Sequence, residues 1–183
     1  MKMTQHKTTK INIPSNTSVD AKFSVAFLLL QDFTLFAFSG FVDVLRLAAD
    51  NLDNSQQRDC KWTIVAHDLK PISSSCGVEV LPWETFSDPE KFDYLVVVGG
   101  RVDPQRKTDS HTINYMKKFS DSGKTIISIC TASFVLARAG LLKGHRCCVH
   151  WYHRAEFEKE FPKIEVDSDT IYIDENDRIT CSG

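Results

Sequence analysis

Hydrophobic residues along this chain form short runs that alternate with stretches of helical spacing. The runs at 23–30 and 92–98 are almost entirely apolar, which predicts strands buried on both faces of a sheet. Residues 34–51 and 110–122 carry apolar side chains three or four positions apart, which predicts amphipathic helices. Strands that alternate with helices predict an α/β fold, a flavodoxin-like three-layer sandwich with a mostly parallel sheet. The other predicted strands are 61–66, 78–81, 125–129, 147–149, 164–166, 170–173 and 178–181, and the other predicted helices are 131–139 and 152–161.

Cys130 lies where the apolar run 125–129 passes directly into a stretch of helical spacing. A strand that turns sharply into a helix around one reactive side chain is a nucleophile elbow. Ser128 and Ala132 on either side are small, as such a tight turn requires. The start of a helix also favours a thiolate over a thiol, so we expect Cys130 to be the centre of a site.

Two further features fall at the ends of predicted strands. Gly99 and Gly100 follow the strand 92–98, and His150 follows the strand 147–149. In parallel sheets ligands bind at the carboxyl ends of the strands. Singly, a glycine pair is most often a turn, a histidine a packed ring and a buried cysteine an inert thiol. Together they match a thiol nucleophile with a base and backbone oxyanion donors, for which the N–H of Thr131 is a second candidate.

Four short motifs carry a family resemblance. They are Val-Val-Val-Gly-Gly at 96–100, Ser-Ile-Cys-Thr-Ala at 128–132, Gly-Leu-Leu-Lys-Gly at 140–144 and Val-His-Trp at 149–151. In this order they resemble the ThiJ/PfpI-like members of the class I glutamine amidotransferase-like superfamily. The chain is most similar to the N-terminal sensor domain of GlxA-type regulators in the AraC family. In those regulators the domain precedes a helix-turn-helix DNA-binding domain, and the resemblance runs from about residue 23 to the end.

The resemblance also implies roles for the candidate residues. Cys130 matches the nucleophile of the superfamily, His150 the histidine near it, and Gly100 and Thr131 the oxyanion donors. Enzymes of the superfamily often have a histidine where this chain has Thr131, and a carboxylate at the position that we assign to Ala37. Without that carboxylate no group is evident to orient His150, which argues against efficient hydrolysis but not against binding. The expected ligand-binding residues are Gly99, Gly100, Arg101, Cys130, Thr131, His150 and Trp151, with Cys130 and His150 as the candidate catalytic pair.

Composition narrows the class of protein. The 183 residues suit a single domain, and 42% hydrophobic with 25% charged residues is typical of a soluble globular protein. The net charge of -2 gives no nucleic-acid signature. No apolar run is long enough to span a bilayer. Residues 1–21 are polar and carry no secretion signal, so we expect them to be a flexible N-terminal tail. Six cysteines without CxxC or zinc-site spacing indicate reduced thiols in the cytoplasm, so we expect no metal and no cofactor.

The leading hypothesis is a ligand-sensing and dimerisation domain of an AraC-family transcriptional regulator. Residues 22–183 would form the ThiJ/PfpI-like domain, truncated before a C-terminal helix-turn-helix domain through which a homodimer contacts operator DNA. The effector would be a small polar metabolite, an amino acid or an amine-like compound, bound at the strand ends near Cys130. Two alternatives stay open. One is a cysteine-dependent amidase, hydrolase or glyoxalase-like enzyme that uses Cys130 and His150. The other is a redox sensor in which Cys130 is oxidised to a sulfenic acid.

Overall fold

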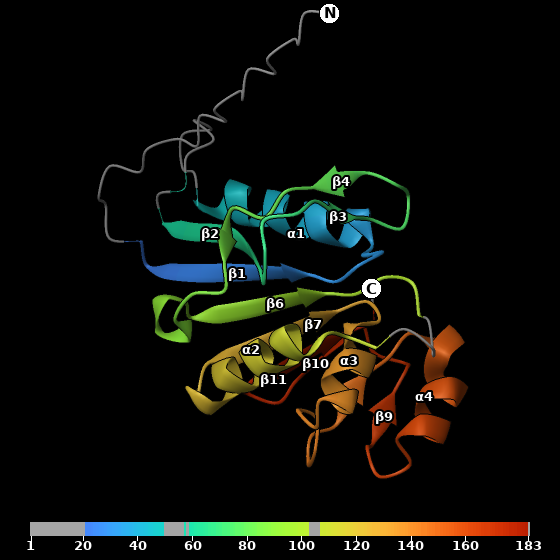
Figure 1. Ribbon diagram of the computed structural model, residues 1–183. Coiled ribbons are helices and arrows are strands. Elements are labelled where there is room, and N and C mark those ends of the chain that lie inside the picture. Colours follow the sequence, from blue (N-terminus) through green and yellow to red (C-terminus); the bar gives the residue numbers. More distant parts are fainter. Residues whose placement is uncertain (1–20, 50–56, 58, 103–106, 183) are drawn as a thin grey trace, which may run out of the picture.

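A seven-stranded sheet forms the centre of the molecule (Figure 1). The computed structural model describes residues 21–49, 57, 59–102 and 107–182. The strands of the sheet are β1 (Phe23–Leu29), β2 (Cys60–Ala66), β5 (Glu84–Thr85), β6 (Tyr94–Val98), β7 (Thr125–Ile129), β10 (Tyr172–Asp174) and β11 (Arg178–Cys181). Their order is β10-β11-β7-β6-β1-β2-β5, and only the edge pair β10–β11 is antiparallel. The five strands β2-β1-β6-β7-β11 have the flavodoxin order, which confirms the predicted fold class.

Helices cover the two faces of this sheet. They are α1 (Leu35–Ala49), α2 (Ser110–Asp121), α3 (Ala132–Arg138) and α4 (Arg154–Glu160), with 3-10 turns η1 (Pro89–Lys91) and η2 (Trp151–His153). Helices α2, α3 and α4 pack into one apolar cluster with alternate residues of the strands, and α1 packs on the opposite face (Figure 1). None of the helices in the described ranges is long and apolar enough to cross a membrane.

Two short strand pairs lie outside the main sheet. Strands β3 (Ile72–Ser73) and β4 (Glu79–Val80) form an antiparallel hairpin. Strands β8 (Cys147–Cys148) and β9 (Val166–Asp167) pair in parallel. The sequence pattern predicted neither β3 nor β5, because a strand of two residues is too short to show an alternating pattern.

The helices that border the site begin and end at recognisable signals. Asp109 caps α2, because its carboxylate accepts a hydrogen bond of 2.9 Å from the N–H of Thr112. Helix α3 ends before Gly140, which has a φ of 78° and so adopts the left-handed conformation of a C-terminal cap, as predicted.

Strand register brings the candidate residues together. Strands β6 and β7 are parallel neighbours, and Val98 pairs with Ile129 at their carboxyl ends. The next residues along each strand, Gly99 and Cys130, therefore lie side by side at one edge of the sheet.

Candidate functional site

Cys130 adopts the strained backbone of a nucleophile elbow. It lies between the last residue of β7 and the start of α3, and its φ of 59° falls in the left-handed region. For a residue with a side chain this conformation costs about 1–2 kcal/mol. The surrounding packing holds it there. The elbow predicted from the sequence is confirmed.

Gly99 and Gly100 allow the elbow to pack directly on the end of β6. A Cβ atom on Gly99 would overlap the backbone nitrogen of Ala132, and one on Gly100 would overlap the carbonyl oxygen of Asp32. The N–H of Gly99 donates to the carbonyl of Ile129 at 3.1 Å, and its own carbonyl accepts from the N–H of Thr34 at 2.8 Å. The glycine pair therefore joins the elbow on one side to the start of α1 on the other.

A hydroxyl group, not a carboxylate, contacts the thiol. The Oγ1 of Thr34 lies 3.4 Å from the Sγ of Cys130. Ala37, three residues further along, is partly buried against the same apolar cluster as Cys130 and offers no polar atom. Thr34 was not among the predicted site residues, although a threonine at the first position of a predicted helix is a recognisable start signal. Because a hydroxyl keeps its proton at neutral pH, it supplies no charge to activate the thiol.

Two backbone donors are available beside the thiol. The N–H groups of Gly100 and Thr131 donate to no acceptor within the described ranges. The side chain of Thr131 is fully engaged, because its hydroxyl donates to the carbonyl of Gly100 at 2.7 Å. This hydrogen bond forms a wall between two cavities, since Gly100 and Thr131 line both of them.

The first cavity, called the thiol cavity here, has a volume of about 410 Å³. Its lining residues are Gly100, Cys130, Thr131, His150, Tyr152, His153 and Ser182. Four of the predicted site residues therefore meet in one place. Trp151 does not line this cavity; its side chain is 70% exposed, with its ring centroid 5.4 Å from that of His150. Tyr152, His153 and Ser182 also line the cavity but were not among the predicted site residues, although Ser182 directly follows a predicted strand.

His150 is placed on the cavity but is poorly prepared to act as a base. Its Nδ1 accepts a hydrogen bond of 3.2 Å from the N–H of Tyr152. In neutral imidazole only one nitrogen has a free lone pair, so the Nε2 atom carries the proton. His150 can take a proton from Cys130 only by giving up the hydrogen bond with Tyr152. The histidine that does face a carboxylate is His153, whose Nδ1 lies 3.4 Å from the Oε2 of Glu156.

The other cysteines show how much the setting of a thiol matters. Burial raises the pKa of Cys147 to about 12 and that of Cys60 to about 11, and the charges of Cys148 and Asp93 respectively add to this. These thiols stay protonated at neutral pH. Cys76, in the turn between β3 and β4, is exposed, and a hydrogen bond with Ser74 lowers its pKa. The cysteines of the described ranges are free, and no group of side chains there can hold a metal ion.

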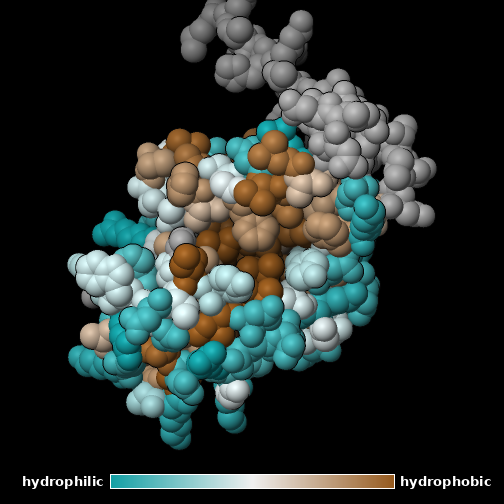
Figure 2. All heavy atoms as spheres, turned by 180° about the vertical axis from the view of Figure 1, so that it is seen from behind, coloured by the Kyte–Doolittle hydropathy of each residue, from teal (hydrophilic) through white to brown (hydrophobic). Residues whose placement is uncertain are grey.

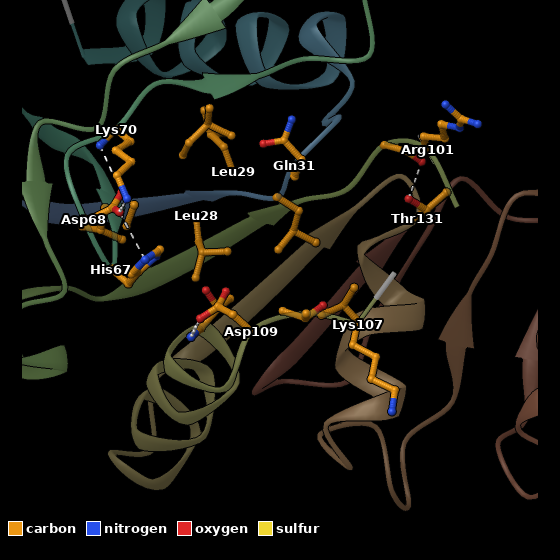
Figure 3. A pocket seen from close by; sticks show the side chains of 18 of the residues that line it. Leu28, Leu29, Gln31, His67, Asp68, Lys70, Arg101, Lys107, Asp109 and Thr131 are labelled. Carbon is orange, nitrogen blue, oxygen red and sulfur yellow. Dashed lines mark hydrogen bonds and ion pairs between the residues drawn. The ribbon is translucent and has the colours of Figure 1, made fainter. Parts of the chain in front are cut away.

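The second cavity, called the charged cavity here, also measures about 410 Å³. It lies across the wall from the thiol, between the carboxyl ends of β1 and β2 and the start of α2 (Figure 3). Apolar residues such as Leu28, Val65 and Phe134 form part of its lining. Its charged or titratable lining residues are His67, Asp68, Lys70, Arg101, Lys107, Asp109 and Arg138. Of the predicted ligand-binding residues, Arg101 lines this cavity, whereas Gly99 is buried below the wall.

Comparison with known proteins agrees with this geometry. The model of the DJ-1/PfpI family matches residues 23–183. The chain belongs to the DJ-1/PfpI family. It is 32% identical over 160 residues to the HTH-type transcriptional regulator GbdR of Pseudomonas aeruginosa, which covers 87% of this chain and 42% of GbdR. It is also 32% identical over 130 residues to the isonitrile hydratase of Pseudomonas putida, covering 70% of this chain and 53% of that enzyme.

A solved structure shows the same fold. The AraC family transcriptional regulator from Pseudomonas putida superposes with a TM-score of 0.72 at 23% identity, over 88% of this chain and 84% of that one. The chain is thus similar both to a regulator and to an enzyme, and it spans less than half the length of GbdR. The geometry of the site is therefore needed to distinguish a sensing role from an enzymatic one.

Proposed function

We propose that this chain is the ligand-sensing and dimerisation domain of an AraC-type transcriptional regulator. Its effector is a small polar metabolite, an amino acid or an amine-like compound, bound at the strand ends near Cys130. A DNA-binding helix-turn-helix domain in the same protein would contact the operator, and the protein would act in the cytoplasm. Binding would shift the population between two arrangements of these DNA-binding domains.

One observation carries this proposal: the thiol borders a pocket, and within the described part of the chain its side-chain hydrogen-bond partner is a hydroxyl group. The side chain in contact with Cys130 is the hydroxyl of Thr34, and the lone pair of His150 is already used by the N–H of Tyr152. The elbow of an enzyme site is present, but neither histidine of the thiol cavity is hydrogen-bonded to the thiol: His150 accepts from Tyr152, and His153 faces Glu156. The likeness to GbdR, an HTH-type transcriptional regulator, supports the same conclusion.

Dimerisation is supported by the surface of α1. Phe36, Val44 and Leu47 on this helix are 85%, 65% and 60% exposed. Large apolar side chains grouped on one helix are typical of a surface that another protein covers. A second copy of the same chain is the occupant that we propose.

The test uses the full-length regulator with a reporter gene under its own operator. We expect Cys130→Ala to keep effector-dependent expression, because sensing requires no reaction of the thiol. Gly100→Ala should abolish it, because the added Cβ atom displaces the wall between the two cavities. Loss of the effector response in the Cys130→Ala protein, with unchanged protein level, would contradict a pure sensing role.

A cysteine-dependent hydrolase is the second candidate, favoured by the elbow and by the two backbone donors at Gly100 and Thr131. It predicts turnover of amide or dicarbonyl substrates that disappears in the Cys130→Ala variant. The redox alternative predicts that peroxide converts Cys130 to a form that dimedone labels. Because Cys76 is exposed and has a lowered pKa, that experiment needs Cys76→Ser as its background.

A further inference from the structure

The charged cavity carries opposite charges at its two ends. Figure 3 shows the cluster of His67, Asp68 and Lys70 together with Asp109 at one end, and Arg101 near the wall at the other. The volume of about 410 Å³ lies in the range of small-molecule sites. Nothing in the thiol chemistry described above uses this cavity.

Most of the lining charges are already neutralised by neighbours. Asp68 accepts from Lys70 at 2.8 Å and lies 3.3 Å from the Nε2 of His67. Arg138 makes two hydrogen bonds, of 2.7 Å and 2.9 Å, with Glu160. These groups have partners within the protein, so they do not need a ligand.

Three charges on the lining lack an ion-pair partner among the described residues. The first is Asp109, whose carboxylate accepts from the N–H of Thr112 at 2.9 Å and faces no cation within ion-pair distance among the described residues. The others are Arg101 and Lys107, which border the cavity and whose exposed side chains extend outward from it in Figure 3. One anion and two cations are therefore available to a ligand. Arg101 lies at the end opposite Asp109, whereas Lys107 is only two residues from Asp109 along the chain (Figure 3).

The chemistry of a matching ligand follows from this arrangement. An ammonium group suits Asp109, and a carboxylate suits the guanidinium of Arg101. Between the two ends, part of the lining of the cavity is apolar, with Leu28, Leu30 and Val135 among its residues. A molecule whose two charges are separated by a chain of methylene groups satisfies all three regions. An α-amino acid does so less well, because its charges sit on adjacent atoms.

We infer that the charged cavity is the effector site and that it takes an ω-amino acid, with the ammonium at Asp109 and the carboxylate at Arg101. Calling this ligand the effector rests on the proposed sensing function, but the binding itself does not. The ligand lies across the Gly100–Thr131 wall from the thiol and does not react with it.

The probe is 5-aminovalerate, tested by calorimetry and by thermal shift on the 183-residue chain. Its isomer norvaline has the same composition, but its ammonium and carboxylate groups are attached to the same carbon. Pentanoate lacks the ammonium group, and pentylamine lacks the carboxylate. We expect 5-aminovalerate to bind and to raise the melting temperature by mass action. Each of the three comparison compounds should bind about tenfold more weakly, or worse, because a charge-assisted hydrogen bond is lost.

Variants then locate the binding site. Asp109→Asn keeps the cap of α2, because an asparagine side chain also accepts from the N–H of Thr112, but it removes the charge. We expect this variant and Arg101→Gln to bind 5-aminovalerate about tenfold more weakly than the original chain. The matched control is Asp121→Asn, on an exposed carboxylate at the other end of the same helix, which should bind unchanged.

Three results would overturn the inference, and each leaves a different conclusion. Binding that is weakened by Cys130→Ala but not by Asp109→Asn puts the ligand in the thiol cavity. Equal affinity for norvaline and 5-aminovalerate removes the ω-amino acid assignment. Failure of 5-aminovalerate to bind at all refutes the inference, while the sensing function is judged separately by the reporter response to other metabolites.

Discussion

The two faces of the central sheet are built from the same strands but are covered very differently. On the side of α2 and α3, Met116, Phe119 and Phe134 are at most 2% exposed. On the other side, Ala49 is the one fully buried residue described within α1. Figure 2 views the molecule from the side opposite to that in Figure 1 and shows hydrophobic side chains gathered across its middle.

The difference is visible within single strands. In β7, Ile126 is fully buried toward α2, whereas its neighbour Ile127 is only partly buried on the α1 side. In β11, Thr180 is buried, whereas its neighbour Ile179 is only partly buried. The first face is a finished hydrophobic core. On the second face Phe27, Val96 and Val98 of the strands are also fully buried, but the outer side of α1 stays exposed. We therefore expect stability to depend on the buried residues and assembly on the outer side of α1.

The largest effect is expected from a matched pair of phenylalanines. Phe119→Ala on the buried face should lower the free energy of unfolding by about 3–5 kcal/mol, because it removes contacts and leaves a cavity. Phe36→Ala on α1 should change the free energy of unfolding of the monomer by no more than about 0.5 kcal/mol, because the ring is already in water. Urea denaturation at low protein concentration measures both. Equal losses would show that the two faces do not differ.

A pair of glycines tests how α1 is held to the sheet. Gly100→Ala should cost about 1–3 kcal/mol, because the new Cβ atom overlaps the backbone of Asp32 just before α1. Gly40→Ala, within α1, meets no atom within 4 Å and should stabilise the protein by up to about 1 kcal/mol, because alanine favours helix. Thermal melts of the two variants compare them. A destabilised Gly40→Ala protein would mean that something packs against that side of α1.

The cap of α2 should have a smaller effect, about 1 kcal/mol for Asp109→Ala. Partial burial acts to raise the pKa of Asp109, but hydrogen bonds from Thr112 and the charge of His67 outweigh it and leave the pKa below its usual value. A lowered folded-state pKa stabilises the fold above the unfolded value of about 3.9 and loses this contribution as the pH falls through the folded-state pKa. The stability gap between the original chain and Asp109→Ala should therefore shrink on acidification below that value. A gap that stays constant in urea titrations at pH 7 and pH 3 would contradict this.

The smallest effect on stability should come from the surface of α1. The triple variant Phe36→Ser, Val44→Ser and Leu47→Ser should unfold with nearly the same free energy as the monomer of the original chain. In sedimentation experiments it should lose the self-association that we expect of the original chain. Leu69→Ser is the control, since this side chain is 55% exposed but lies outside α1. A monomeric original chain would show that a copy of itself does not cover this face.

The sequence predicted the parts of the molecule that depend on neighbouring residues. The apolar run 125–129, the small residues around Cys130 and the cap at Gly140 all report local geometry, so the elbow and its helix were foreseen. The contact of Thr34 with the thiol depends on where the chain enters α1, which the spacing of residues does not reveal. The charged cavity is a stronger case, because Asp68, Arg101 and Asp109 come from three separate loops that only the order of the strands brings together.

The hydrogen bond from Thr131 to Gly100 has a consequence for both cavities. A single shared wall makes their occupancies linked equilibria, and such linkage is reciprocal. If a ligand in the charged cavity changes the affinity of the thiol for a reversible modifier by some factor, that modifier must change the affinity of the ligand by the same factor. A metabolite signal and an oxidation signal would then be read by one element of the fold, without any contact between the two chemicals.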